Sequence, residues 1–113
     1  LITLPELYLI QPNQTTRIYA KNAVYQNQSA NTSIAFHDDV LVIIDMGDSR
    51  PCAINTQHIT YYPQDNRIET QYPTQALQPK LLTDSPNGFQ LDLSNRELTF
   101  GENSQFTLLT SSL

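Results

Sequence analysis

Short apolar runs separated by polar, turn-forming clusters follow one another along this 113-residue chain. The runs are rich in Ile, Val, Thr, Tyr and Leu and recur at the spacing of roughly 8–12 residues that is typical of β-sandwiches and rolls. No window of a dozen residues keeps the i, i+3, i+4, i+7 apolar spacing of an amphipathic helix, and seven prolines interrupt the chain. The pattern predicts an all-β domain, with strands at residues 7–10, 17–25, 33–36, 40–44, 52–62, 67–70, 80–83, 88–93, 97–100 and 106–110.

Alternation within the strands indicates which faces are buried. In residues 89–93 the apolar side chains alternate with Gln90 and Asp92, so this strand has one polar face. Residues 40–44 are apolar at every position. That strand is therefore either central and covered on both faces, or covered on one face and in contact with a ligand or partner on the other.

An internal repeat appears when the chain is shifted by 36 residues against itself. In each copy the matched positions are first two residues apart, then three residues apart, then two residues apart again. The three-residue step would turn the following side chains to the other face of the strand unless a β-bulge or bend absorbs the extra residue. A polar loop and a return strand follow each copy. Stacked units of this kind predict an elongated, open roll. The matched positions are Ile18, Ala20, Ala23 and Tyr25 in the first copy and Ile54, Thr56, Ile59 and Tyr61 in the second.

Composition and charge narrow the functional classes. The net charge of −5 and the pI near 4.6 leave no cationic surface for nucleic acid or an anionic membrane. The longest apolar run has five residues, whereas a membrane-spanning helix needs about 20. We expect a single domain over residues 1–113, and since the chain begins at Leu1 rather than Met, we expect a fragment of a longer protein. The lone Cys52 is expected to be a small buried side chain.

Several short segments, taken in order along the chain, form a recognisable pattern. They are Arg17-Ile18-Tyr19-Ala20 with Ala23 and Tyr25, residues 34–42, Ile54-Asn55-Thr56 with Ile59, Tyr61-Tyr62-Pro63, Ile68-Glu69-Thr70 with Tyr72-Pro73, and Asn87-Gly88-Phe89 with residues 91–93, Leu98 and Phe100. Together they resemble the periplasmic domain of the LptC family, the OstA-like lipopolysaccharide-export proteins of Gram-negative bacteria. The sequence departs from the family pattern where it has no Trp, where Asp38 and Asp39 replace a turn glycine, and where Thr74 replaces a Val.

The resemblance implies an open β-jellyroll of stacked antiparallel strands with no significant helix. It implies a non-enzymatic domain without cofactors, held at the periplasmic face of the inner membrane by an N-terminal anchor that lies outside this sequence. The implied partners are lipopolysaccharide, an inner-membrane LptBFG-like ABC transporter and an LptA-like periplasmic bridge protein.

Inward-facing apolar residues of such a roll would form a trough for the acyl chains of lipopolysaccharide, although the same residues would also be expected in an ordinary core. Exposed strand edges at the C-terminal end would pair with the bridge protein. The residues expected to line the trough are Ile18, Ala20, Val40, Val42, Ile54, Phe89, Leu91 and Phe100. Those expected at the partner edge are Glu97, Leu98, Thr99, Phe100, Phe106 and Leu108.

Enzymatic and metal-binding functions find little support. The residues 37–39, His-Asp-Asp, read as a solvated turn, and His58 has no accompanying nucleophile motif. No glycine-rich phosphate loop is present. The alternative from another class is a β-sandwich adhesin or carbohydrate-binding module, which the absence of Trp disfavours and the six Tyr residues keep open.

Overall fold

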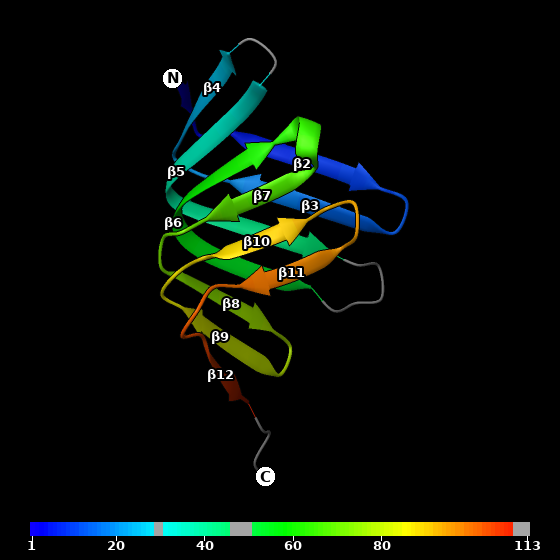
Figure 1. The fold of residues 1–113 in the computed structure, drawn as a ribbon, viewed down its shortest axis with the longest axis vertical. Helices are drawn as coiled ribbons and strands as arrows, with labels where there is room; N and C mark the ends of the chain where they lie inside the picture. Colours follow the sequence, from blue (N-terminus) through cyan, green and yellow to red (C-terminus); the bar gives the residue numbers. More distant parts are fainter. Residues whose placement is uncertain (29–30, 46–50, 110–113) are drawn as a thin grey trace.

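A computed structural model describes residues 1–28, 31–45 and 51–109 as an elongated antiparallel β-structure measuring 55 × 30 × 25 Å (Figure 1). Its single helical turn among these residues is η1. The elements are β1 (Ile2–Thr3), β2 (Glu6–Gln11), β3 (Gln14–Tyr19), β4 (Asn22–Gln28), β5 (Asn31–Asp45), β6 (Cys52–Tyr62), η1 (Pro63–Asp65), β7 (Arg67–Thr70), β8 (Thr74–Gln78), β9 (Leu81–Ser85), β10 (Phe89–Asp92), β11 (Glu97–Phe100) and β12 (Gln105–Leu108).

The strands form two walls that share β5 and β6. The first wall has the order β2-β3-β5-β6-β8-β9-β12 and uses the second half of β5 and the first half of β6. The second wall has the order β1-β4-β5-β6-β7-β10-β11 and uses the other halves of the same two strands. All pairings are antiparallel. Since strands that follow one another in the sequence often belong to different walls, the chain passes repeatedly from one wall to the other.

A β-bulge bends β5 where it changes walls. The pairing with β6 shifts between His37 and Val40, so that Asp38 and Asp39 stand opposite Gln57. Both aspartates have left-handed backbone angles, with φ values of 70° and 53°, which Asp tolerates better than most residues. The backbone N–H of Asp39 donates to Gln57 Oε1 at 3.2 Å. Asp38 and Asp39 therefore adopt the left-handed backbone conformation at the place where the family pattern has a turn glycine.

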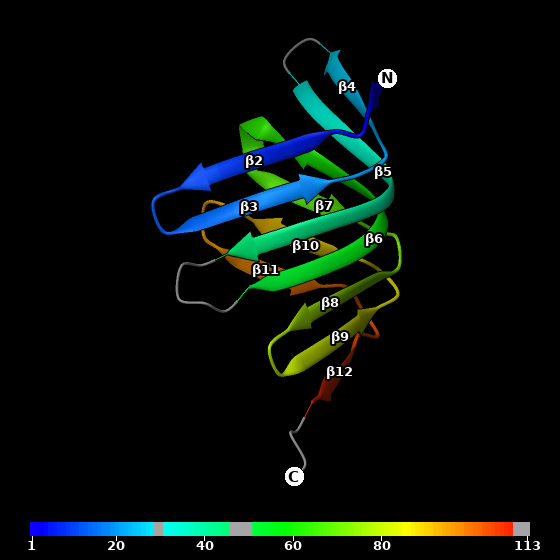
Figure 2. The same cartoon turned by 180° about the vertical axis from the view of Figure 1, so that it is seen from behind.

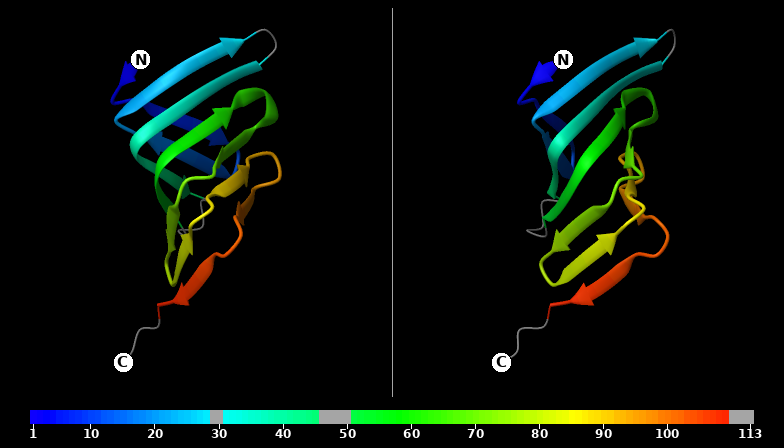
Figure 3. Two further views of the ribbon diagram at one scale, coloured as in Figure 1. Left: turned by 60° about the vertical axis from the view of Figure 1, so that its left-hand side comes forward. Right: turned by 90° about the vertical axis from the view of Figure 1, so that its left-hand side faces the viewer.

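Within the described residues, every passage between the walls lies on one side of the molecule, which we call the bend side. In Figures 1 and 2 this side carries the bends of β5 and β6 and the connections β1–β2, β3–β4, β7–β8, β9–β10 and β11–β12; Figure 3 turns it towards the viewer. The β2–β3, β8–β9 and β10–β11 turns lie on the opposite side, the open side, where each turn stays within its own wall. The walls are thus joined through the backbone along one side.

Inward-facing side chains of both walls meet in one hydrophobic core, because alternation places every second residue of each strand between the walls. The buried positions alternate in β3 and keep one phase along β5, with Phe36 before the bend and Val40 after it, whereas in β6 the alternation changes phase at the bend as the repeat predicted. In β6 the buried positions are Ile54 and Thr56 before the bend and Ile59 and Tyr61 after it. The core consists of Ile18, Ala20, Ala23, Phe36, Val40, Val42, Ile44, Cys52, Ile54, Ile59, Tyr61, Ile68, Ala76, Phe89, Leu91 and Leu93.

The all-β, open jellyroll-like fold predicted from the sequence is confirmed, and three predicted strands, at 52–62, 67–70 and 97–100, have the observed bounds. Three expectations were wrong. The strand expected at 17–25 is divided between β3 and β4, because residues 20–21 pass from one wall to the other. The strands expected at 33–36 and 40–44 are one strand, β5, since the bulge bends the ladder without ending it. Strand β8 was missed because Pro73 and the amide-rich sequence around it read as a loop, and β1 was missed because its two residues are too few to show alternation. Residue 110, in the last predicted strand, lies outside the described residues.

Candidate functional site

The residues expected to line the trough all lie between the two walls. Seven of them are buried members of the core, and Phe100 is partly buried against it. They come from five strands and from the β3–β4 connection, so the structure brings together residues that are up to 82 positions apart. In this structure they pack against one another. The eight positions are Ile18, Ala20, Val40, Val42, Ile54, Phe89, Leu91 and Phe100.

A rim of partly buried apolar residues continues the core. Leu7 and Leu9 belong to β2, Ile34 to β5, and Leu98 and Phe100 to β11. Strands β2 and β11 each pair with one neighbour in the described structure, so their four side chains are at the outer strands of the two walls, whereas Ile34 lies on a central strand. Apolar side chains therefore extend from the core to the outer strands β2 and β11.

A hydrogen bond closes part of the open side, at a place we call the mouth. Gln11 Nε2, at the end of β2 in the first wall, donates to the carbonyl oxygen of Leu93, after β10 in the second wall, at 2.8 Å. A cavity of about 260 Å³ lies beside this bond. Its lining comes from both walls and comprises Tyr8, Leu9, Ile10, Gln11, Tyr61, Asn66 and Leu93.

Two buried polar residues lie on the inner face of β3 behind the mouth, and the sequence reasoning missed both. Gln14 is 3% exposed and Thr16 is fully buried. Gln14 Nε2 donates to Gln11 Oε1 at 3.4 Å, while Gln14 Oε1 and Thr16 Oγ1 have no hydrogen-bond partner among the described residues. Their signal in the sequence was alternation, because positions 14 and 16 are in phase with the buried Ile18.

Most buried hydroxyl groups near the bend side donate hydrogen bonds to backbone carbonyl oxygens. Thr56 Oγ1 donates to the carbonyl oxygen of Pro73 at 2.9 Å, and Thr74 Oγ1 donates to that of Tyr72 at 2.9 Å. Ser85 Oγ donates to the carbonyl oxygen of Gly88 at 2.6 Å. These bonds fix the β7–β8 and β9–β10 connections, so this end of the interior is structural in character.

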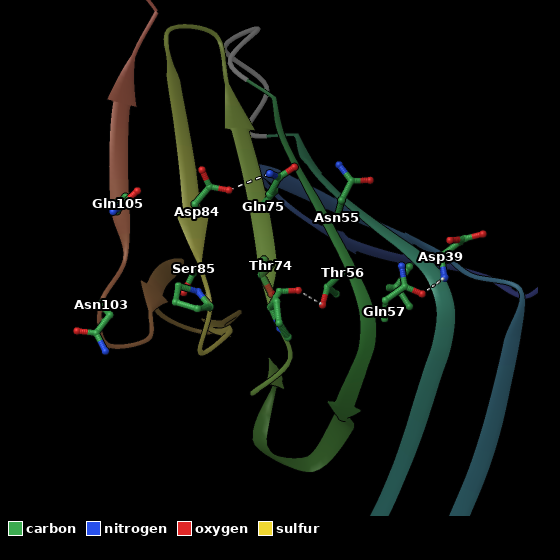
Figure 4. Close-up of a pocket in the computed structure, with 13 residues that line it drawn as sticks. Asp39, Asn55, Thr56, Gln57, Thr74, Gln75, Asp84, Ser85, Asn103 and Gln105 are labelled. Carbon is green, nitrogen blue, oxygen red and sulfur yellow. Dashed lines mark hydrogen bonds between the residues drawn. The ribbon is translucent and has the colours of Figure 1, made fainter.

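A wide polar groove of about 850 Å³ lies on the outside of the first wall, next to the bend (Figure 4). Asn55, Gln75, Asp84 and Gln105 stand in register on adjacent strands along it. Gln75 Nε2 donates to Asp84 Oδ1 at 2.8 Å. Most of the residues that line it carry amides, hydroxyls or carboxylates, which distinguishes this groove from the interior.

Titratable groups at the bend form an exposed ion pair and a histidine pair. Lys21 Nζ lies 2.9 Å from Asp39 Oδ2; this hydrogen-bonded lysine lowers the pKa of Asp39 and the aspartate raises that of Lys21. His37 and His58 face each other across β5 and β6, and partial burial, with the nearby His37, lowers the pKa of His58. Among the residues that the structure describes, no group of three or more His, Cys, Asp or Glu side chains could hold a metal ion.

The strands expected to bind a partner are outer strands of the walls. Strand β11 pairs only with β10, and β12 only with β9, within the described residues. Phe106 and Leu108 of β12 are 60% and 72% exposed, and the Phe106 ring contacts Phe100 edge-to-face at 6.1 Å. At the other end of the molecule, β1 and β2 are also outer strands. Glu97, Leu98, Thr99 and Phe100 thus lie on one outer strand, β11, and Phe106 and Leu108 on another, β12, and the two strands are in contact through Phe100 and Phe106.

Comparison with known families identifies the family of this chain. The family model described as "Lipopolysaccharide-assembly, LptC-related" matches residues 1–108. The chain belongs to the LptC-related family. A search of curated proteins finds no match. Membership confirms the resemblance seen in the sequence and places this LptC-related domain in lipopolysaccharide transport, on the periplasmic side. In the described parts of the chain no helix is long and apolar enough to cross a membrane.

Proposed function

We propose that this LptC-related domain carries lipopolysaccharide by accommodating its acyl chains between the two walls, without catalysing a reaction. The observation that carries the proposal is a hydrophobic core enclosed by walls that, in the part of the chain that the structure describes, the backbone joins along one side only. Burying apolar chains there is worth about 25 cal/mol per Å². Because the core is packed in this structure, uptake requires the walls to separate at the open side, and the rim residues of β2 and β11 then meet the chains first.

Charge favours binding through the tails. The net charge of −5 makes the protein a poor partner for the anionic phosphates of the lipopolysaccharide headgroup. The headgroup therefore stays in solvent outside the mouth while the acyl chains occupy the interior.

Photocrosslinking tests the proposal. A diazirine analogue of leucine is placed at the buried positions Val42 or Leu91, or at the rim position Leu98, and the matched control is Gln90, which is exposed on the outer face beside Leu91. We expect lipopolysaccharide to be labelled from the interior and rim positions and not from Gln90. Labelling from Gln90 alone would reject the interior as the binding site.

The C-terminal edges of β11 and β12 are proposed to receive the LptA-like bridge protein by strand addition, which exposed edges favour. The N-terminal end would then face the LptBFG-like transporter at the inner membrane. Deletion of all residues beyond Asn103 removes β12 and should abolish pulldown of the bridge protein. The control is Leu4→Lys, a change at an exposed residue between β1 and β2 at the other end, which should leave pulldown intact. Unchanged pulldown after the deletion would reject this end as the contact.

Carbohydrate binding is the second candidate function, and the polar outer groove is the observation that favours it. A displacement assay with fluorescent lipid A, run beside a glycan array, separates the two functions. Displacement that depends on the acyl chains supports transport, whereas sugar binding without lipid binding supports a carbohydrate-binding module.

A further inference from the structure

The mouth combines an apolar lining with two neighbouring amides. Gln11 and Gln14 face each other across the two-residue β2–β3 turn. Gln11 is partly exposed beside the cavity, and Gln14 is buried behind it. The pair therefore connects the opening on the surface with the inner face of the first wall.

The hydrogen bonds of this pair leave one strong acceptor unused. Gln14 donates to Gln11, and Gln11 donates across the mouth to the carbonyl oxygen of Leu93. Gln14 Oε1 accepts no hydrogen bond from the residues that the structure describes. Buried polar atoms in folded proteins are nearly always paired, so an exception calls for an explanation. An amide oxygen accepts and never donates, so the group that fits it must carry an O–H or N–H.

The surroundings indicate what else such a ligand must carry. Leu9, Tyr61 and Leu93 line the cavity beside Gln11, and the inner face of β3 continues from Gln14 through Thr16 to the core residue Ile18. The cavity of about 260 Å³ is below the ~300–1,000 Å³ of sites that enclose a whole small molecule. It suits one segment of a longer apolar ligand whose polar group stops at the amides while its tail points towards the core.

We propose that Gln11 and Gln14 form a polar subsite at the mouth that binds the hydroxyl or amide N–H group of a functionalised acyl chain. The proposal rests on acyl-chain binding in the interior. On binding, Gln11 Nε2 leaves the Leu93 carbonyl and donates to the oxygen of the ligand group, and the ligand's O–H or N–H donates to Gln14 Oε1. A plain alkyl chain offers neither partner, so it would break the bond of Gln11 to Leu93 without replacing it.

The test is a displacement titration on the chain of residues 1–113 loaded with the dye N-phenyl-1-naphthylamine. Three competitors of equal chain length are compared: myristic acid, 3-hydroxymyristic acid and N-myristoylglycine. We expect Gln14→Leu to reduce the affinity for the donor-bearing competitors about tenfold relative to myristic acid, which corresponds to about 1.4 kcal/mol. Expressing each result as a ratio to myristic acid removes the intrinsic difference in hydrophobicity between the competitors. If the affinity relative to myristic acid falls for the hydroxylated acid alone, or for the amide alone, the result supports the subsite and identifies which donor group it binds.

Controls separate this subsite from the proposed function. Gln90→Leu, on an outer face, should leave all ratios unchanged, and Gln14→Met and Gln11→Leu repeat the test if Gln14→Leu does not fold. Equal ratios in the wild-type protein and in the Gln14 variants, with myristic acid still bound, would overturn the subsite alone. If none of the three competitors displaces the dye, acyl binding in the interior and the subsite are both overturned.

Discussion

Gly88 lies at the β9–β10 connection on the bend side. We expect the addition of a single methyl group at this residue to cause a large loss of stability. Its φ of +85° is left-handed. A Cβ built there would lie 1.9 Å from the carbonyl oxygen of Thr70 and 2.6 Å from its carbonyl carbon, both backbone atoms. Thr70 is paired with Phe89 in the β7–β10 ladder, so it can move only with the ladder.

Two costs add for Gly88→Ala. The left-handed backbone costs about 1–2 kcal/mol for a residue with a Cβ, and forcing an extra methyl group into packed structure costs about 1–3 kcal/mol. The sum is a loss of about 2–5 kcal/mol from a domain of ordinary stability, about 5–15 kcal/mol. At roughly 4 °C per kcal/mol for a chain of this size, the melting temperature should fall by about 8–20 °C.

Urea and thermal unfolding followed by circular dichroism measure this loss. Gly88→Asn distinguishes the two causes, since Asn tolerates a left-handed backbone but still brings the Cβ. We expect it to keep the crowding cost of about 1–3 kcal/mol and so to lose less than Gly88→Ala. The matched control is Arg96→Gly in the exposed β10–β11 turn, where φ is 56°; it should change stability by less than about 1 kcal/mol or increase it. A change below about 0.5 kcal/mol in Gly88→Ala would refute the reasoning from crowding.

Three further predictions concern titratable groups. The lowered pKa of Asp39 means that its contribution to stability is present above the ordinary carboxyl range and is lost as the pH falls through the folded pKa; Lys21→Met should raise the Asp39 midpoint measured by NMR. The lowered pKa of His58 means that the unfolded chain binds the proton first as the pH falls. Stability should therefore decrease as the pH falls through about 6.5, and it should level off below the folded pKa. His37→Gln should raise the titration midpoint of His58. Burial raises the pKa of the Cys52 thiol to about 11, so a thiol reagent at pH 8 should label the native protein slowly and the urea-unfolded protein fast; equal rates would contradict the burial.

Local alternation made much of this fold predictable. The three-residue step in both repeat copies required a bend, and the bend is found where β6 passes between the walls and where residues 20–21 leave β3. Alternation also placed Ile18 and Ile54 inside. It could not show that Tyr25 would be 55% exposed while its counterpart Tyr61 is nearly buried, because that depends on the number of strands stacked beyond each residue.

The features that sequence reasoning missed at the site depend on contacts over long separations. The bond from Gln11 to Leu93 joins residues 82 positions apart, and no local pattern marks either of them. Gln14 and Thr16 are polar, and polarity argued against burial although their phase with Ile18 argued for it. The phase was correct because β3 is covered by the second wall, which a single strand's sequence does not reveal.

Joining the walls along one side only has a mechanical consequence. A rotation about the bend side would widen the molecule while the hydrogen-bonded ladders within each wall remain intact. Amide hydrogen exchange in the strands would then stay slow during such a motion, whereas the methyl resonances of core residues such as Val42 and Leu91 would shift. The distance between the two walls can in this way change while the hydrogen bonds within each wall stay intact.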